Sequence, residues 1–245
     1  MKLYGKNPVI ERLKSNPKSI QKIYIQERHP DEGYIRKKAQ KWGISVYSVP
    51  RTKVQKIAHS LNTQGVVADI AQYPYTPYAD ILTMKRKKLD AIIFLDGLTD
   101  PQNFGAIIRS LSCLGTFALV LPTHKSVEVT ETVLRVACGG ENYLPIAKVA
   151  NLNNAIKAAK EAGFWIVGTV VGEGEDLMAT KLNFPLGLII GSEQKGIRDI
   201  TRKHLDTIVT IPMSQPRMSF NVAQAATVFG YEIIKQKKQP SQAAA

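Results

Sequence analysis

The sequence predicts an α/β protein built from a small N-terminal domain and a larger C-terminal one. Apolar runs of strand length alternate with helical periodicity along most of the 245 residues, which is typical of a mostly parallel sheet covered by helices. Positive charge is uneven, because residues 1–72 contain 14 of the 33 lysines and arginines but only 5 of the 20 acidic residues. We therefore expect domains at 1–72 and 89–236, a linker at 73–88 and a flexible tail at 237–245.

The N-terminal domain is expected to be a small α/β unit with short elements. Helical patterns cover residues 8–13, 32–42 and 52–59, and strand patterns cover residues 20–25, 44–49 and 66–70. Its positive charge suits a polyanion, so nucleic acid is a natural partner, with a merely soluble basic surface as the alternative. We expect most of its lysines and arginines to form a solvated face and a minority to contact RNA phosphate.

The expected linker begins with Tyr-Pro-Tyr-Thr-Pro-Tyr at residues 73–78. Two prolines in six residues favour an extended, stiff spacer over a helix or an interior strand. We expect the tyrosines to pack against the domains more often than they stack on RNA bases. The basic run at residues 85–88 directly precedes the second domain and is either a phosphate contact or a solvated face.

The second domain begins with an apolar strand at residues 89–95. Further strands are expected at 117–121, 164–170, 186–190 and 207–211, and helices at 104–114, 130–138, 152–162 and 222–234. Asn103 is suited to cap the first of these helices. Glycines and polar residues follow the strands at 186–190 and 207–211, and ligands of open α/β sheets bind at the carboxyl ends of strands. We therefore expect a ligand site there.

Several classes of protein are disfavoured. The apolar runs are shorter than the ~20 residues of a membrane helix, and the N-terminus lacks the apolar core of a signal peptide, so we expect a cytoplasmic protein. The sequence has no P-loop, and Gly172-Glu173-Gly174 is an incomplete dinucleotide fingerprint. The four histidines lack ligand spacing, so no metal is expected. Cys113 and Cys138 lie in apolar helical patterns and are expected to be buried, reduced thiols.

Three motifs occur in order in the second domain. The first is Asn103-x-Gly105-x-x-x-Arg109, and the second is IIGSEQKG at residues 189–196. The third is Ile-Pro-Met at 211–213, which five intervening residues separate from Ser-Phe-Asn at 219–221. Together they resemble the motifs of SpoU/TrmH-type RNA 2′-O-ribose methyltransferases, including those that methylate guanosine in 23S rRNA. Residues 4–9 and 63–68 resemble the ribosomal-protein-like RNA-binding domain that precedes the catalytic domain in many of these enzymes.

The resemblance implies a C-terminal α/β-knot domain with a deep trefoil knot, which pairs as a homodimer. It implies S-adenosylmethionine as cofactor and an RNA substrate, with large-subunit rRNA favoured over tRNA. The residues that match cofactor-binding positions are Thr169, Gly172, Gly191, Gly196, Ile211, Met213 and Phe220. Those that match catalytic positions are Asn103, Arg109, Glu193, Ser219 and Asn221.

Arg109 matches the arginine proposed in this family to activate the ribose 2′-hydroxyl. A free arginine is a poor general base because its pKa lies above about 12. It can instead orient the hydroxyl, stabilise the developing alkoxide or pass the proton to an RNA phosphate.

The loop at residues 214–218 departs from the family pattern. The family commonly has a small residue and a glycine after Ile-Pro-Met, whereas this chain has Ser214 and Gln215, and Phe220 replaces the usual leucine. A side chain at position 215 restricts the backbone, which puts cofactor binding in question. Arg217 adds a positive charge suited to RNA phosphate. The alternatives are a non-catalytic RNA-binding or ribosome-assembly protein on the same fold, and a tRNA 2′-O-methyltransferase.

Overall fold

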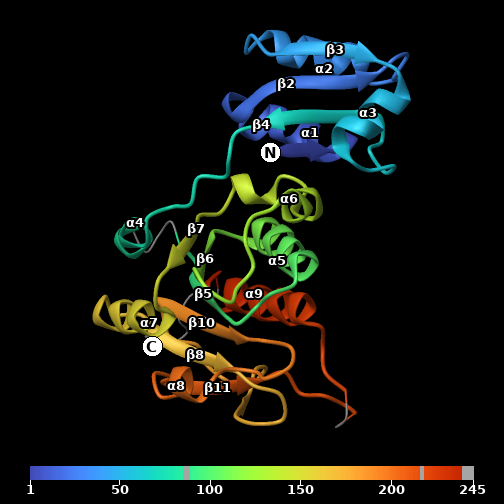
Figure 1. The fold of residues 1–245 in the computed structure, drawn as a ribbon. Coiled ribbons are helices and arrows are strands. Elements are labelled where there is room, and N and C mark those ends of the chain that lie inside the picture. The colour runs from blue at the N-terminus through green and yellow to red at the C-terminus, as the bar shows by residue number, and fades with distance from the viewer. Residues whose placement is uncertain (85–88, 216–217, 239–245) are drawn as a thin grey trace. The chain divides into compact units, whose positions relative to one another are not determined.

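The computed structural model describes residues 1–84, 89–215 and 218–238 (Figure 1). The chain forms two compact units: the first comprises Met1–Pro74 and Glu128–Asn142, and the second comprises Tyr75–Val127 and the residues from Tyr143 onward. The basic run at 85–88, Arg217 and residues 239–245 of the expected tail lie outside the described residues. No helix in the described part of the chain is long and apolar enough to span a membrane.

The first unit contains a four-stranded mixed sheet in the order β1-β4-β2-β3. Its strands are β1 (Lys2–Tyr4), β2 (Ile20–Gln26), β3 (Ser45–Val49) and β4 (Val66–Ile70). Its α-helices are α1 (Lys6–Ser15), α2 (Glu32–Gln40), α3 (Arg51–Ala58) and α6 (Glu131–Ala137), with short 3₁₀ turns at Pro17–Ser19 and Gly140–Asn142. Strands β2 and β3 are parallel, whereas β4 runs antiparallel to both β1 and β2.

Residues 128–142 belong to the first unit although the sequence places them among elements of the second domain. A buried ion pair joins Arg12 of α1 to Glu141, with 2.9 Å between Nη2 and Oε1. Both side chains are almost completely excluded from solvent. Burial raises the pKa of Glu141, and it lowers the pKa of Arg12. An isolated charge at either position would be costly to bury, so the pair fixes this segment to α1.

The second unit contains a seven-stranded sheet in the order β7-β6-β5-β10-β8-β11-β9. Its strands are β5 (Ala91–Asp96), β6 (Phe117–Pro122), β7 (Ile146–Val149), β8 (Trp165–Thr169), β9 (Glu175–Asp176), β10 (Leu186–Gly191) and β11 (Thr207–Thr210). Every pairing between these strands is parallel. The expected α/β class and parallel sheet are thus confirmed, while the trefoil knot stays a prediction.

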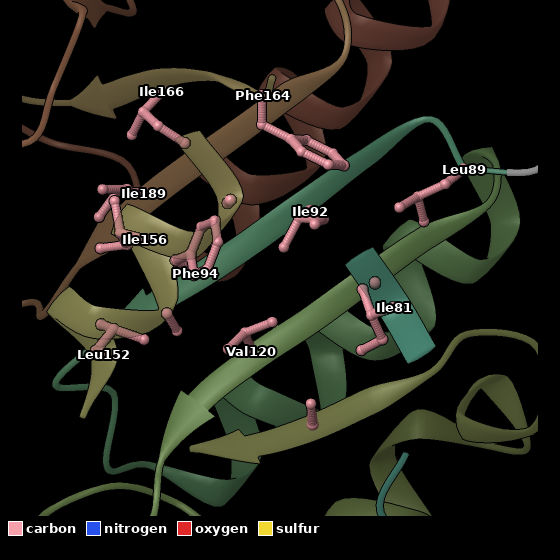
Figure 2. Close-up of a cluster of buried hydrophobic side chains, with 14 of the residues drawn as sticks. Ile81, Leu89, Ile92, Phe94, Val120, Leu152, Ile156, Phe164, Ile166 and Ile189 are labelled. Carbon is pink, nitrogen blue, oxygen red and sulfur yellow. The ribbon is translucent and has the colours of Figure 1, made fainter. Parts of the chain in front are cut away.

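Helices cover this sheet as the alternation predicts. They are α4 (Tyr78–Thr83), α5 (Pro101–Leu114), α7 (Leu152–Glu161), α8 (Asp199–Arg202) and α9 (Val222–Lys238). Figure 2 shows the core between α7, α4 and the sheet, where Ile156 and Ile81 approach Ile92, Phe94 and Val120.

Helices α5 and α9 lie side by side elsewhere in the unit (Figure 1). A Cβ atom added at Gly230 would lie 2.7 Å from Leu111 Cδ2, so a glycine allows this close packing.

Some local expectations need correction. Helix α5 begins at Pro101 and its N-cap is Asp100, which accepts hydrogen bonds from the backbone amides of Gln102 and Asn103; Asn103 is therefore not the cap. Cys113 is exposed, because it follows the exposed Arg109 by four residues on the same helix face, and Cys138 is only partly buried. Helix α9 continues to Lys238, so the first two residues of the expected tail are helical.

The expected linker also contains structure. Residues 78–83 form α4, whose Ile81 is fully buried. The Tyr78 hydroxyl donates a 2.7 Å hydrogen bond to the carbonyl of Ala155, and burial raises its pKa. The Lys148 ammonium lies 5.0 Å from the ring centre of Tyr75. Both tyrosines therefore pack against the second unit, as expected.

Candidate functional site

A cavity of about 780 Å³ lies at the carboxyl ends of β8 and β10. Its walls come from residues 169–171 at the end of β8, from residues 190–193 and 195–197 at the end of β10 and in the loop after it, and from residues 218–222 and 225 at the start of α9. Neighbouring parallel strands bring their carboxyl ends to the same edge of a sheet, which is why segments distant in sequence meet here. The volume is within the range of about 300–1,000 Å³ that is usual for small-molecule sites.

The loop at residues 192–196 forms one wall of this cavity. Ser192 and Gly196 exchange two backbone hydrogen bonds of 3.0 and 2.9 Å, which close a tight turn. A Cβ atom at Gly191 would lie 2.1 Å from the carbonyl carbon of Gly196, so this position requires glycine. Gly196 has a φ of +62°, and a Cβ there would meet only open space. Gly191 thus allows the two ends of the turn to approach closely, and Gly196 leaves open space beside the turn.

Three side chains from the three sequence motifs form a hydrogen-bonded chain. Asn221 Nδ2 donates to Asn103 Oδ1 at 3.0 Å, and Asn103 Nδ2 donates to Glu193 Oε1. The donor and acceptor roles in these hydrogen bonds are set at Asn221, whose Oδ1 already accepts a hydrogen bond of 2.9 Å from the backbone amide of Ala223. The Nδ2 group of Asn221 must therefore face Asn103, and Asn103 in turn must direct its own Nδ2 group toward Glu193.

The chain leaves one carboxylate oxygen of Glu193 available. Among the described residues, Oε2 of Glu193 has no hydrogen-bond partner, and the side chain is exposed on the cavity wall. A carboxylate held at one oxygen can accept a proton or a hydrogen bond at the other. The site therefore presents an oriented acceptor next to a ligand-sized space.

The structure brings most of the predicted site residues together. Of those expected to bind cofactor, the cavity is lined by Thr169, Gly191, Gly196 and Phe220, and of those expected to be catalytic it is lined by Glu193, Ser219 and Asn221. Asn103 reaches the site through its bonds to Glu193 and Asn221. Gly172, Ile211 and Met213 do not line the cavity. Gly172 has a φ of +71°, and its amide donates to Thr210 Oγ1 at 3.2 Å.

Arg109 is not brought to the cavity. It lies on α5 six residues after Asn103, which corresponds to about one and two thirds helical turns, so the two side chains point in different directions. Its side chain is exposed and has no hydrogen-bond or ion-pair partner within residues 1–84, 89–215 and 218–238. Any partner of Arg109 would have to come from another molecule or from residues outside these ranges.

Sequence reasoning missed Arg202 and Lys195 as lining residues. Arg202 comes from the four-residue helix α8 and donates Nη2 to Glu173 Oε1 at 2.6 Å. A helix this short has no periodic pattern that could have marked it. Lys195 could have been found, because it lies between Glu193 and Gly196 in the second motif. In the described part of the chain, no group of three or more His, Cys, Asp or Glu side chains could hold a metal ion.

Models of known protein families match both the N-terminal and the C-terminal part of the chain. Residues 90–231 match the model of the SpoU rRNA Methylase family, and residues 2–76 match a model described as RNA 2′-O ribose methyltransferase substrate binding. The chain is 31% identical over 243 residues to the 23S rRNA (guanosine-2′-O-)-methyltransferase RlmB of Coxiella burnetii, covering 98% of this chain and 97% of that protein.

Two further relatives extend the comparison. The chain is 36% identical over 240 residues to the uncharacterized tRNA/rRNA methyltransferase slr0955 of Synechocystis; the match covers 96% of this chain and 62% of that longer protein. The structure of an AdoMet-bound rRNA methyltransferase from Sinorhizobium meliloti is similar, with a TM-score of 0.77 and 25% identity over 96% of this chain and 86% of that one.

Proposed function

This chain belongs to the SpoU rRNA methylase family, and from that premise we propose that it transfers a methyl group from S-adenosylmethionine to a ribose 2′-hydroxyl of RNA. The observation that carries the proposal is the chain Asn221–Asn103–Glu193 beside the cavity at β8 and β10. It joins one residue from each of the three motifs, although Asn103 is 90 residues from Glu193 and 118 residues from Asn221.

The cavity fits S-adenosylmethionine in size and in chemistry. Val170, Ile190 and Ile197 supply apolar wall, and the partly exposed ring of Phe220 supplies a flat surface for a base. The open space beside Gly196 lets a ligand approach the backbone. When bound, the cofactor supplies a methyl group already activated by its sulfonium. Gly172, Ile211 and Met213 would act only through the loops that they form.

The protein groups at the site would position the acceptor hydroxyl and receive its proton. The free oxygen of Glu193 can accept that proton directly or through water. Asn103 and Asn221 hold this carboxylate in place, and the Ser219 hydroxyl can donate or accept a hydrogen bond beside it. Preorganised groups of this kind lower the barrier by fixing the geometry before reaction.

We assign RNA as the substrate and large-subunit rRNA as its most favoured class. Residues 1–72 carry most of the excess positive charge, and residues 2–76 match a substrate-binding model. The Coxiella burnetii relative is named as a 23S rRNA enzyme, which supports rRNA, while the Synechocystis relative carries the broader name tRNA/rRNA methyltransferase. An rRNA target also agrees with the expected location in the cytoplasm.

A homodimer through the second unit forms part of the proposal. Val228 and Tyr231 are exposed on α9 at 37% and 62%, and they are three residues apart on one face of the helix. Exposed apolar side chains on one face favour association with another surface. The guanidinium of Arg109 on the adjacent helix α5 is exposed and has no partner among the described residues, so it is available to RNA or to a second subunit.

The proposal is tested by methyl transfer to RNA from a strain that lacks this gene. Large-subunit rRNA, small-subunit rRNA and tRNA are incubated separately with the protein and methyl-labelled S-adenosylmethionine, then digested to nucleosides for mass spectrometry. We expect a 2′-O-methylated nucleoside in the large-subunit fraction alone. A product only in tRNA would replace the rRNA assignment, and a label on a base would refute 2′-O transfer.

A further inference from the structure

A second cavity, of about 480 Å³, lies at the carboxyl edge of the same sheet. Its walls are formed by residues 96–99 at the end of β5, by His124 and Lys125 in the loop after β6, by residues 150–153 at the start of α7, and by residues 192–195 and Arg198. Ser192, Glu193 and Lys195 line both cavities. The 192–196 loop therefore separates two ligand-sized spaces, and Glu193 is accessible from each.

Arg198 is fixed in this second cavity by a buried carboxylate. Asp96 ends strand β5, is completely buried, and accepts hydrogen bonds from Arg198 Nε at 2.6 Å and from the backbone amide of Arg198 at 3.0 Å. The Arg198 side chain remains 51% exposed, and Nη1 and Nη2 have no partner among the described residues. Since a guanidinium is planar, fixing Nε also fixes the two free donors, which suits an oxyanion.

The net charge of the second cavity suits a ligand that carries a single negative charge. Lys125, Lys195 and Arg198 contribute three positive charges, which Asp96 and Glu193 reduce to a surplus of one when His124 is neutral. Lys125 and Lys195 are both exposed, and neither side chain has a partner in the described structure. A phosphodiester carries one negative charge, whereas a nucleoside triphosphate would bring three or four and exceed this surplus. The balance therefore favours a link within a nucleic acid chain over a free nucleotide.

Polar groups beside these cations can recognise the rest of a nucleotide. Asn151 caps α7 and accepts the amides of Asn153 and Asn154 at 2.9 and 3.2 Å, which keeps the positive end of the helix dipole close to the cavity. Asn153 also lines the cavity, and its Oδ1 atom is buried without a hydrogen-bond partner. A ribose hydroxyl or a base amino group could donate to this oxygen.

We propose that the second cavity binds one phosphodiester and the attached nucleoside of the RNA substrate, with Lys125 and Arg198 as the phosphate contacts. This assignment rests on the proposed RNA methyltransferase function. It places RNA on one face of the 192–196 loop and the cofactor on the other, so Glu193 lies where the two ligands meet. The free carboxylate oxygen of Glu193 is thereby accessible to an RNA hydroxyl in the second cavity.

The test uses Lys125→Ala in the full-length protein, with Lys181→Ala as its matched control. Lys181 is also an exposed lysine of the second unit, but it lines neither cavity. Affinity for an in vitro transcript of large-subunit rRNA is measured at several salt concentrations. We expect Lys125→Ala to weaken binding about tenfold at low salt and to reduce the slope of log K against log salt by about one, as for a lost phosphate contact. Lys181→Ala should behave as the wild type.

Arg198→Lys provides a second variant that keeps the charge opposite Asp96 but loses the planar donor pair. We expect Arg198→Lys to weaken RNA binding without altering the slope of log K against log salt. In both Lys125→Ala and Arg198→Lys, the affinity for S-adenosylmethionine should stay within about threefold of the wild type, because neither residue lines the cofactor cavity. Wild-type RNA affinity and slope in folded Lys125→Ala would overturn the inference. Loss of cofactor binding in that variant would overturn it too, because the cavity would then belong to the cofactor site.

A failure of the proposed methyltransferase function can be told apart from a failure of the RNA site. If the wild-type protein transfers no methyl group but still binds RNA through Lys125, the RNA site stands and the catalytic assignment fails.

Discussion

The side-chain amide of Asn221 donates a 3.0 Å hydrogen bond to the amide oxygen of Asn103, although 118 residues separate them in the chain. This bond connects the start of α9 to the first turn of α5, two helices that also pack against each other. Asn103 also donates a hydrogen bond to Glu193, so the packing of α5 against α9 holds the Glu193 carboxylate in a fixed orientation. The site is therefore assembled by the fold of the second unit.

Asn103→Asp should reduce methyl transfer with little effect on cofactor binding. The substitution removes the amide donor to Glu193 and places a second carboxylate beside it, so Glu193 loses its orientation and its charge environment changes. We expect the single-turnover rate to fall by about tenfold to a hundredfold. Calorimetric affinity for S-adenosylmethionine should change by less than about threefold, since Asn103 does not line the cofactor cavity.

Gln102→Glu serves as the control for Asn103→Asp. It introduces the same charge one residue earlier, on an exposed side chain that makes no hydrogen bond to Glu193 among the described residues. An equal loss of rate in both variants would show that added negative charge, rather than the hydrogen-bonded chain, is responsible.

Gly191→Ala should damage the cofactor site far more than Gly196→Ala. At position 191 the new methyl group would collide with the backbone of Gly196 and Ile197, so the 192–196 loop would have to move. At position 196 the methyl group meets open space, and the positive φ costs only about 1 kcal/mol. We expect cofactor affinity to fall more than tenfold in Gly191→Ala and to fall less in Gly196→Ala. The reverse order, measured by calorimetry, would contradict the packing described here.

Glu141→Gln should change how stability depends on pH. Burial raises the pKa of Glu141 in the folded protein, so its contribution to stability is fully present below its unfolded pKa and is lost as pH rises through the folded value. The wild-type free energy of unfolding should therefore decline between that lower pH and neutrality relative to Glu141→Gln, in which this titration is absent. Denaturant melts across pH 4–7 measure the two slopes.

The relative stability of Glu141→Gln and the wild type follows from the same shift. Gln keeps position 141 neutral, as burial favours, so we expect the two free energies of unfolding to be closest near pH 4 and the variant to gain on the wild type as pH rises toward neutrality. If the variant shows the same pH slope as the wild type, Glu141 is not the group that titrates.

Tyr231→Asp should prevent the proposed dimer from forming. A charge on the exposed face of α9 would remain partly desolvated in an interface that contains Val228 and Tyr231. We expect sedimentation to give a mass near twice the 27.1 kDa chain for the wild type and near one chain for the variant. Trp165→Asp, on another exposed aromatic residue that lies on β8 and not on α9, should remain dimeric. A monomeric wild type would refute the dimer.

The sequence patterns identified the long elements and most of the cavity because those features depend on local periodicity and adjacent motifs. The strands at β5, β6, β8 and β10 follow from apolar runs, and Glu193, Ser219 and Phe220 follow from motif positions. The prediction that Asn103 caps α5 was wrong, although Asp100 directly before Pro101 is a stronger signal for the start of a helix.

Other features could not be predicted because they depend on contacts between distant residues. Glu141 joins the first unit through Arg12, which is 129 residues away in the chain. Strand β9 has two residues and α8 has four, too few for a periodic pattern, so Arg202 could not be placed beside the cavity. The second cavity needs the ends of several strands at once, and no single motif marks it.

Cofactor binding is tested most directly by calorimetric titration with S-adenosylmethionine of the wild type, Phe220→Asp and Met178→Asp. Phe220 is 45% exposed and lines the cofactor cavity, whereas Met178 is an apolar side chain that is 75% exposed and lies outside it. We predict micromolar binding by the wild type and Met178→Asp, and a loss of at least about tenfold in Phe220→Asp. Absence of binding by the folded wild type, with and without rRNA, would contradict the account and favour a non-catalytic RNA-binding protein.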